Sequence, residues 1–289
     1  MEKVTILGGD RRSFLLGQLL AEDGKQVTFY GFDKLEATEP KLVLTLEEAI
    51  EASDILIGPL PFTNKKGNLN VPYSNTEITL AQLFQQMNSK QILLGGHIPK
   101  QQLNKGRRKG LRIIDYFVRE ELQWLNAIPT VEGALQLAME KQDITIHGSN
   151  VFVLGFGRIG KVLADRLYHL GAKVHVVARK FSDLAVATAY RYEAVHLEDL
   201  DYYLHKMDTI FNTVPAILLT DEKLQKVDKN CILIDLASQP GGIDRDAARQ
   251  LNLETYLALG LPGKVAPLTA ARCIRKTIYN ILIDLEVST

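Results

Sequence analysis

Three glycines with the spacing G-x-G-x-x-G, Gly155, Gly157 and Gly160, form the segment of this sequence best suited to hold an anionic ligand. An apolar run at 151–154 precedes them, and a helical pattern at 158–170 follows. In such a strand–turn–helix unit the first glycine makes the turn, the second lets a pyrophosphate approach, and the third lets helix and strand pack closely. The helix N-terminus then favours the phosphates. The context predicts a dinucleotide site; the alternative is a glycine-rich turn without a ligand.

The next predicted strand, 173–177, ends just before two cations that bear on which dinucleotide binds. Arg179, Lys180 and Ser182 stand where an NAD site would carry an acid for the ribose 2′-hydroxyl. Two cations and a hydroxyl suit a 2′-phosphate, and arginine offers a fork of donors. Asp183 is expected to fall too far along the chain to act as that acid. We therefore expect NADP(H) as the cofactor, with a solvated charged loop as the alternative.

Three later loops should complete the cofactor site, because ligands bind beyond the carboxyl ends of the strands in such sheets. These loops follow predicted strands, although each is also explained as a simple turn. With the glycine motif they give the predicted cofactor-binding residues: Gly155, Phe156, Gly157, Arg158, Ile159, Gly160, Arg179, Lys180, Ser182, Asn212, Thr213, Val214, Pro215, Ala237, Ser238, Gly260 and Leu261.

The first half of the chain carries candidate substrate-binding residues at predicted strand ends. Arg11 and Arg12 follow the strand 3–7 at the start of a helix, a favourable place for a carboxylate. Ser74 lies in a loop of the same half. A surface-exposed arginine pair is the alternative. The G-x-G-x-x-G spacing does not recur here, so we do not expect a second dinucleotide.

The acid–base candidates are a histidine and a glutamate. His97 follows the strand 91–95, and imidazole titrates near neutral pH, although a lone loop histidine is more often structural. Thr130 is a further substrate-binding candidate and Glu132 is a catalytic candidate, because both should face the substrate at the start of a helix. The alternative for Glu132 is that the helix dipole alone favours an acid at that position. The sequence shows no metal-ligand spacing.

Apolar runs and helical patterns alternate twice along the chain, which predicts two doubly wound α/β domains with parallel sheets. The expected strands are 3–7, 26–30, 42–45, 54–57, 91–95, 111–114, 151–154, 173–177, 194–196, 208–212, 231–235 and 254–258. The clearest helical patterns are 13–23, 76–88 and 158–170.

The stretch 116–142 should link the two domains as two helices with a bend, because Pro129 disfavours helix at Ile128. We expect the last helix, 268–285, to cross back to the first domain, by analogy with two-domain dehydrogenases. The predicted domains are a flavodoxin-like or Rossmann-like substrate domain and a Rossmann NADP-binding domain, at 1–128 with 268–289 and at 129–267.

Composition excludes several classes of protein. Lys+Arg and Asp+Glu are both 34, which gives no electrostatic footprint for nucleic acid or an anionic membrane. Two cysteines do not make a disulfide framework, and no apolar run reaches the roughly 18 residues of a membrane span. The opening residues read as a strand and a glycine turn rather than an apolar leader. We expect a cytoplasmic protein.

Several motifs together resemble the family of dipicolinate synthase A subunits. They are Asn126–Ala134, Gly155–Lys161 and Leu261–Ala270, supported by Gly8–Arg11 and Ile234–Ser238. The likeness runs over essentially the whole chain. The combination is fairly specific, whereas the glycine motif alone is not.

This resemblance implies NADP-dependent oxidation of a dihydrodipicolinate-type precursor to dipicolinic acid during sporulation. It implies a small dicarboxylate substrate, for which Arg11 or Arg12 would supply charge. It also implies a flavoprotein-like second subunit, with the synthase acting in the mother cell. We further expect a homo-oligomer. The family often has alanine where this chain has Val131, a departure that leaves Glu132 in place.

Two other functions stay open at this point. One is another dehydrogenase of hydroxy or amino acids, which would usually place a histidine with a carboxylate partner in the later half of the chain. No later histidine stands in a convincing strand-end loop; these are His169, His175, His196 and His205. The other is a non-catalytic, nucleotide-sensing subunit, which hydride transfer by the purified chain would exclude.

Overall fold

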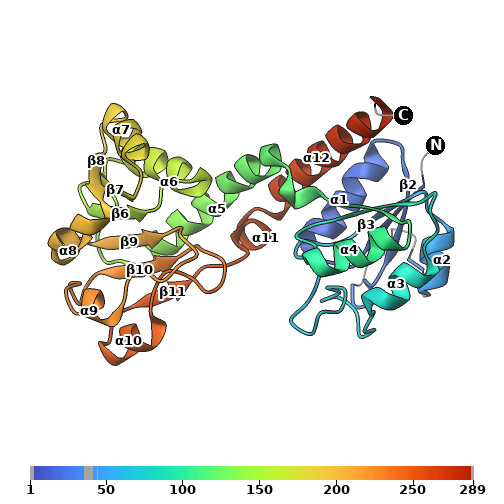
Figure 1. The fold of residues 1–289 in the computed structure, drawn as a ribbon, viewed down its shortest axis with the longest axis horizontal. Helices are drawn as coiled ribbons and strands as arrows, with labels where there is room; N and C mark the ends of the chain where they lie inside the picture. The colour runs from blue at the N-terminus through green and yellow to red at the C-terminus, as the bar shows by residue number, and fades with distance from the viewer. Residues whose placement is uncertain (1–2, 36–41, 44, 288–289) are drawn as a thin grey trace. The chain divides into compact units, whose positions relative to one another are not determined.

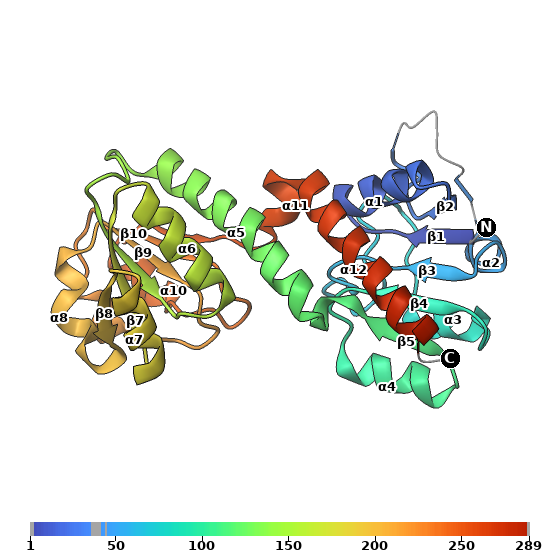
Figure 2. The ribbon, with the colours of Figure 1, turned by 90° about the horizontal axis from the view of Figure 1, so that it is seen from above.

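The fold was analysed in a computed structural model that describes residues 3–35, 42–43 and 45–287. The chain divides into two compact units, Met1–Asn126 with Ala266–Thr289, and Ala127–Val265. Each unit is built on one parallel sheet with helices on both faces (Figures 1 and 2). The predicted fold class, two doubly wound α/β domains, is confirmed.

Within the described residues, the first unit has a five-stranded sheet in the order β2-β1-β3-β4-β5, with every pair parallel. Its elements are β1 (Lys3–Leu7), α1 (Arg11–Glu22), β2 (Gln26–Tyr30), α2 (Leu46–Glu51), β3 (Ile55–Ile57), α3 (Leu80–Gln86), β4 (Ile92–Gly95), α4 (Lys100–Arg108), β5 (Arg112–Asp115), the short 3-10 helix η1 (Tyr116–Val118) and α12 (Pro267–Val287). The strand order reverses between β1 and β3, and open α/β sheets bind ligands at such a switch point.

Alternate residues of these strands face opposite layers of helix, as the period of two of a strand requires. Ile6 and Ile57 pack in a cluster with α1 and α12. Leu7 and Leu56 pack in a second cluster with residues of α2 and α3. Because both faces are covered, the strands are continuously apolar rather than alternating, which is typical of parallel sheets.

The second unit has, among the described residues, a six-stranded parallel sheet in the order β11-β10-β9-β6-β7-β8. After α5 (Glu120–Lys141) its elements are β6 (Asn150–Leu154), α6 (Arg158–His169), β7 (Lys173–Ala178), α7 (Phe181–Ala189), β8 (Glu193–His196), η2 (Leu197–Asp199), α8 (Leu200–Tyr203), η3 (Leu204–Lys206), β9 (Thr209–Asn212), α9 (Asp221–Leu224), β10 (Ile232–Asp235), α10 (Arg245–Gln250), β11 (Thr255–Leu257) and α11 (Leu261–Val265). This is the Rossmann strand order, with its switch point between β6 and β9.

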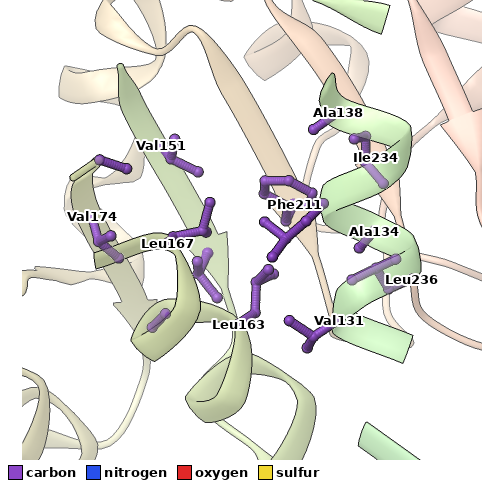
Figure 3. Packing of buried hydrophobic residues seen from close by; sticks show 14 of the residues in the cluster. Val131, Ala134, Ala138, Val151, Leu163, Leu167, Val174, Phe211, Ile234 and Leu236 are labelled. Carbon is purple, nitrogen blue, oxygen red and sulfur yellow. The ribbon is translucent and has the colours of Figure 1, made fainter. Parts of the chain in front are cut away.

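One core layer of this unit joins α5 and α6 to the sheet (Figure 3). Val131 and Ala134 of α5, Leu163 of α6, Val151 of β6 and Phe211 of β9 are all essentially inaccessible to solvent. Burying one valine or leucine side chain contributes about 1.5–3 kcal/mol. The layer therefore fixes α6, and with it the turn that precedes the helix.

Helix α5 runs without interruption from Glu120 to Lys141, with Pro129 inside it. The prediction of two helices with a bend was wrong in this respect. Proline removes one helical hydrogen bond and disfavours a helical residue before it. Here Leu122 packs in the core of the first unit, and Val131 packs in that of the second. This packing on both sides of the proline outweighs the local preference.

The C-terminal helix α12 lies beside α1 in the first unit, as both views show and as predicted (Figures 1 and 2). Ile274 and Ile278 are buried in the cluster that contains α1. Arg275 pairs with Asp23, just after α1, at 3.0 Å. Apolar burial and this ion pair hold α12 against the first unit.

Two other predictions in the first half differ from the structure. The strand expected at 42–45 is an isolated bridge between Leu42 and Phe29, and residue 44 lies outside the described residues. The helix expected at 76–88 starts only at Leu80. Thr79 caps it, and Gln82 completes a capping box, which fixes the helix start.

Candidate nucleotide site

The turn after β6 has the backbone that the glycine motif predicts. Gly155 has φ +93°, a conformation that other residues rarely adopt. A Cβ at Gly160 would lie 2.1 Å from the carbonyl oxygen of Gly155, so only glycine lets α6 approach the strand this closely. A Cβ at Gly157 would meet no atom within 4 Å. The turn thus leaves open space in front of Gly157, where a phosphate can approach.

Helix α6 begins at this open space. Its N-cap is Gly157, which has no side chain to satisfy the amides of the first turn. The first turn itself consists of Arg158, Ile159 and Gly160, so no carboxylate of that turn competes for the helix dipole. The positive end of a helix dipole favours an anion. The open cradle and the uncapped helix fit the pyrophosphate of a dinucleotide.

A cleft of about 360 Å³ opens at the carboxyl ends of β6, β7 and β9. It brings together eight of the predicted cofactor-binding residues: Gly155, Phe156, Gly157, Arg179, Lys180, Thr213, Val214 and Pro215. The sequence analysis missed further lining residues, Val177, Ala178, Asp183, Leu197, Ala216 and Leu218. Most of these adjoin predicted positions, so the strand ends were the signal that could have found them.

Asp183 is the informative case among them. We expected it too far along the chain to act as the ribose-binding acid of an NAD site, and it lines the same cleft as Arg179 and Lys180. It lies in the first turn of α7, where the helix dipole favours an acid. Because α7 starts at Phe181, directly after the cations, the helix turns Asp183 back to the cleft. The charged residues that line the cleft are therefore of both signs rather than all positive.

The other predicted cofactor residues do not line this cleft. Arg158 and Ser182 are exposed, Ile159 packs partly against the core, and Gly160 serves the helix–strand contact. The remaining ones lie at or just after the ends of the later strands: Asn212, Ala237, Ser238, Gly260 and Leu261. Of these, Leu261 is a core residue of α11 packed near Gly133 of α5.

Asn212 and Asp235 organise the later loops from inside the protein. The Asn212 side-chain amide donates to the Val214 carbonyl at 2.9 Å, and its oxygen accepts the Val214 amide at 3.1 Å. The Asp235 carboxylate accepts the amides of Ala237 and Gly242, at 3.1 and 2.9 Å. Val214 lines the cleft, so these buried polar groups set the shape of its wall.

In the first unit, the predicted substrate-binding residues have different environments. Arg11 is exposed at the first position of α1. Arg12 is buried and forms an ion pair with Asp10 at 2.7 Å, and it also donates to the Leu60 carbonyl at 2.5 Å. Through these contacts Arg12 holds together the turns that follow β1 and β3. Arg11 is the arginine that remains presented to solvent.

Ser74 is buried and serves its own loop. Its hydroxyl accepts the Thr76 amide at 3.0 Å. A hydrogen bond to Ser74 is also the main cause that lowers the pKa of the Asp33 carboxyl, and the Asn75 amide adds to it. The structure therefore shows Ser74 holding a turn.

His97 is held in an unusual backbone conformation after β4. Its φ is +58°, which is uncommon for a residue other than glycine and costs about 1–3 kcal/mol. The Asp115 carboxylate compensates by accepting the amides of His97 and Ile98, at 2.9 and 2.8 Å. The ring is exposed and meets the edge of Phe117. The sequence analysis missed Asp115, although an acid at a strand end was the signal that could have found it.

Thr130 and Glu132 both lie inside the continuous helix α5, in the part that belongs to the second unit. Thr130 is buried, and Glu132 is exposed. Since α5 begins at Glu120, the expected helix start beside them does not exist. The dipole argument for an acid at position 132 therefore does not apply.

The described part of the chain holds no cluster of metal ligands. It contains no group of three or more histidine, cysteine, aspartate or glutamate side chains arranged to hold a metal ion. Within the same residues, no helix is long and apolar enough to cross a membrane.

The fold and the cleft define a protein with a dehydrogenase-type NAD-binding domain. Residues 116–248 match the family model for the NAD-binding domain of D-isomer specific 2-hydroxyacid dehydrogenases. Domains of this class bind a nicotinamide dinucleotide, and the match supports the assignment of the chain as an oxidoreductase. Residues 3–117 match a second model, that of the N-terminal domain of the A subunit of dipicolinate synthase.

The chain belongs to the family of dipicolinate synthase A subunits. The A subunit of dipicolinate synthase from Bacillus subtilis (strain 168) is 31% identical over 287 residues, covering 98% of this chain and 97% of the relative. The crystal structure of the same kind of subunit from Bacillus halodurans has a TM-score of 0.87 at 31% identity, over 97% of both chains. The one from Bacillus subtilis has a TM-score of 0.88 at 30% identity, over 100% of this chain and 98% of that one. The resemblance inferred from the motifs is confirmed.

Proposed function

We propose that this chain catalyses the NADP-dependent oxidation of a dihydrodipicolinate-type ring dicarboxylate to dipicolinic acid. The observation that carries the proposal is the nucleotide cleft with Arg179 and Lys180 at its rim. The cleft lies in a chain whose full-length relative is the A subunit of dipicolinate synthase. The family suggests the product of the reaction, and the nucleotide cleft suggests that the reaction is a hydride transfer.

The preference for NADP over NAD rests on Arg179. It follows directly after β7, where an acid would bind the ribose hydroxyls of NAD. The guanidinium fork suits the 2′-phosphate, and Lys180 adds a second positive charge. Asp183 on the same cleft lowers the local positive potential without occupying that position. In our proposal the two cations outweigh it.

The dicarboxylate would bind at the carboxyl edge of the first sheet. Arg11 stands at the start of α1, next to the switch point between β1 and β3, and its guanidinium is exposed. A helix N-terminus and an arginine together favour a carboxylate. Arg12, locked to Asp10, would shape the turn instead of binding the substrate.

The oxidation removes one hydride and one proton from the dihydropyridine ring and leaves an aromatic product. The bound oxidised nicotinamide would supply the hydride acceptor. The chain must then take up the ring proton, and His97 is the group that we propose for this step. Its exposed ring and its left-handed backbone, held by Asp115, support that role, since strained residues cluster at functional sites.

We also propose the finer biological setting, which the family suggests. The second subunit would be flavoprotein-like, and the synthase would act in the cytoplasm of the mother cell of a sporulating bacterium. A homo-oligomer of this chain is part of the same proposal. Size measurement of the purified chain, by itself and with the second subunit, tests the assembly.

The decisive test is product analysis. Purified chain, with and without the second subunit, is given the dihydrodipicolinate precursor with NADP⁺ or NAD⁺. Equal amounts of NADPH and pyridine-2,6-dicarboxylate, identified by mass, support the proposal. Turnover only with 2-hydroxy acids would show a different dehydrogenase. Nucleotide binding without turnover under every condition would show a sensing subunit.

A further inference from the structure

A second cavity, of about 460 Å³, lies in the first unit, apart from every residue assigned above. Its walls come from α3, from α4 and from the loop that carries Gly67 and Asn68. The volume lies in the range of small-molecule sites. No step of the proposed oxidation uses this cavity.

Three cations of α4 and its C-cap line one wall: Lys105, Arg108 and Lys109. Lys105 lies three residues before Arg108 and four before Lys109, so its side chain neighbours both of theirs on the helix, where like charges repel. Among the described residues, none of the three pairs with a carboxylate, and no carboxylate lines the cavity. The nearby Glu77 is already paired with Lys66 at 2.5 Å. An anion bound here would therefore relieve an uncompensated repulsion.

The α3 side of the cavity is largely apolar. Leu80 and Phe84 border it from the core with only 3% and 4% of their surfaces exposed, and Ala81 is exposed. Such a wall favours a flat hydrocarbon or aromatic body over a bare inorganic ion. The cavity thus combines an apolar face with a cationic one.

The spacing between these two walls is fixed by packing. A Cβ at Gly106 of α4 would lie 2.1 Å from Cδ1 of Ile113 and 3.6 Å from Cε2 of Phe84. Glycine therefore lets α4 press against both β5 and α3. Because α3 and α4 are each anchored in this core, the cavity is a built feature of the unit.

We propose that this cavity binds a small aromatic dicarboxylate. The ring would lie against the exposed Ala81 of α3, and the carboxylates would reach Lys105, Arg108 and Lys109. The natural ligand that we favour is the pyridine dicarboxylate product, and this choice rests on the proposed function. The binding of small aromatic dicarboxylates as a class does not depend on that function. Occupied by the product, the cavity would serve as a product-sensing site distinct from the site of oxidation.

Isothermal titration with benzene-1,3-dicarboxylate tests this proposal, because this probe has the shape of the product but does not chelate metals. The wild type should bind it, and the variant Lys105→Gln/Arg108→Gln/Lys109→Gln should bind about tenfold or more weakly, having lost its charge-assisted contacts. Glutamine keeps the helix propensity high. The control Lys90→Gln/Lys100→Gln/Arg112→Gln removes the same charge from the same unit and should bind like the wild type.

A second variant separates the cavity from its charge. Ala81→Phe fills the space and keeps all three cations, so it should weaken binding as much as the glutamine variant does. Arg11→Ala, which tests the proposed oxidation instead, should leave this binding intact. Unchanged affinity in Ala81→Phe would overturn the proposal. So would inorganic phosphate that binds as tightly as the dicarboxylate, because the groove would then be a general anion surface.

Discussion

The side-chain amide of Asn212 donates a hydrogen bond to Oδ1 of Asp235 at 2.7 Å, and both side chains are essentially inaccessible to solvent. The pair joins the ends of β9 and β10, which neighbour each other in the sheet. Through Val214 and Gly242 it reaches the loops that follow both strands. The wall of the nucleotide cleft is therefore built on a buried polar network rather than on direct contacts from Asn212.

Replacing Asp235 by alanine should destabilise the second unit. The change removes the acceptor of one Asn212 side-chain N–H and of the backbone amides of Ala237 and Gly242, and each buried unsatisfied donor costs about 1–3 kcal/mol. We expect a total loss of several kcal/mol, measured by denaturant unfolding. Asp246→Ala, at an exposed aspartate of α10, is the matched control and should stay within about 1 kcal/mol of the wild type. A wild-type transition in Asp235→Ala would contradict the structural role.

Gly157→Val should abolish binding of the dinucleotide without unfolding the protein. Its Cβ would enter open space, and that space is where the pyrophosphate must lie. Gly160→Val offers the contrast: its Cβ would lie 2.1 Å from the Gly155 carbonyl oxygen, so this variant should unfold more easily. Thermal unfolding and titration with NADPH on the same samples separate the two effects. Tight binding by folded Gly157→Val would show that the nucleotide lies elsewhere.

Arg179→Ala should weaken NADPH binding and leave NADH binding nearly unchanged. The lost charge-assisted contacts with the 2′-phosphate are worth about 1.5–3 kcal/mol, roughly tenfold or more in Kd. Asp183→Asn should act in the opposite direction and tighten NADPH binding, because it removes a carboxylate from the same cleft. Arg249→Ala, at an exposed arginine of α10, controls for a general change in charge. Equal losses for both cofactors in Arg179→Ala would mean that Arg179 does not read the 2′-phosphate.

The sequence was sufficient for the two sheets and for the turn after β6. Parallel strands buried on both faces read as unbroken apolar runs, and the glycines of a dinucleotide turn have a fixed spacing. Sequence did not predict that α5 continues through Pro129, because tertiary packing on both sides decides it. The outer strand expected at 42–45 was wrong for a local reason, because Thr45 at its end is the N-cap of α2.

Side-chain roles were harder to predict than strand ends. Arg11 and Arg12 are identical in type and adjacent in sequence, yet one is exposed and the other is locked to Asp10. Asn212 was expected at the cofactor but bonds to Asp235, a partner 23 residues away in the chain. Such pairings depend on which side of a strand end a residue faces. Sequence spacing alone does not give that orientation.

Arg11→Ala should raise the KM for the dicarboxylate, or lower kcat/KM, and leave cofactor affinity nearly unchanged. Arg11 is the exposed cation at the start of α1, where a substrate carboxylate would gain both the helix end and the guanidinium. Arg112→Ala, at an exposed arginine of the same unit, is the control and should behave like the wild type. Arg112 is preferred to Arg107, because the Arg107 side chain donates a hydrogen bond to the Ile113 carbonyl. Normal kinetics in Arg11→Ala would exclude it from substrate binding.

His97→Asn should reduce turnover far more than it reduces substrate binding. Asparagine tolerates the left-handed backbone at φ +58°, so the fold and the amide bonds to Asp115 should survive. It does not titrate near neutral pH, and loss of acid–base assistance typically costs about 10²–10⁴-fold in rate. Steady-state kinetics should show a lower kcat with a similar KM, together with loss of one limb of the pH–rate profile. His169→Asn, at an exposed histidine of α6, should behave like the wild type. If His97→Asn keeps the wild-type kcat and pH profile, another group takes the ring proton.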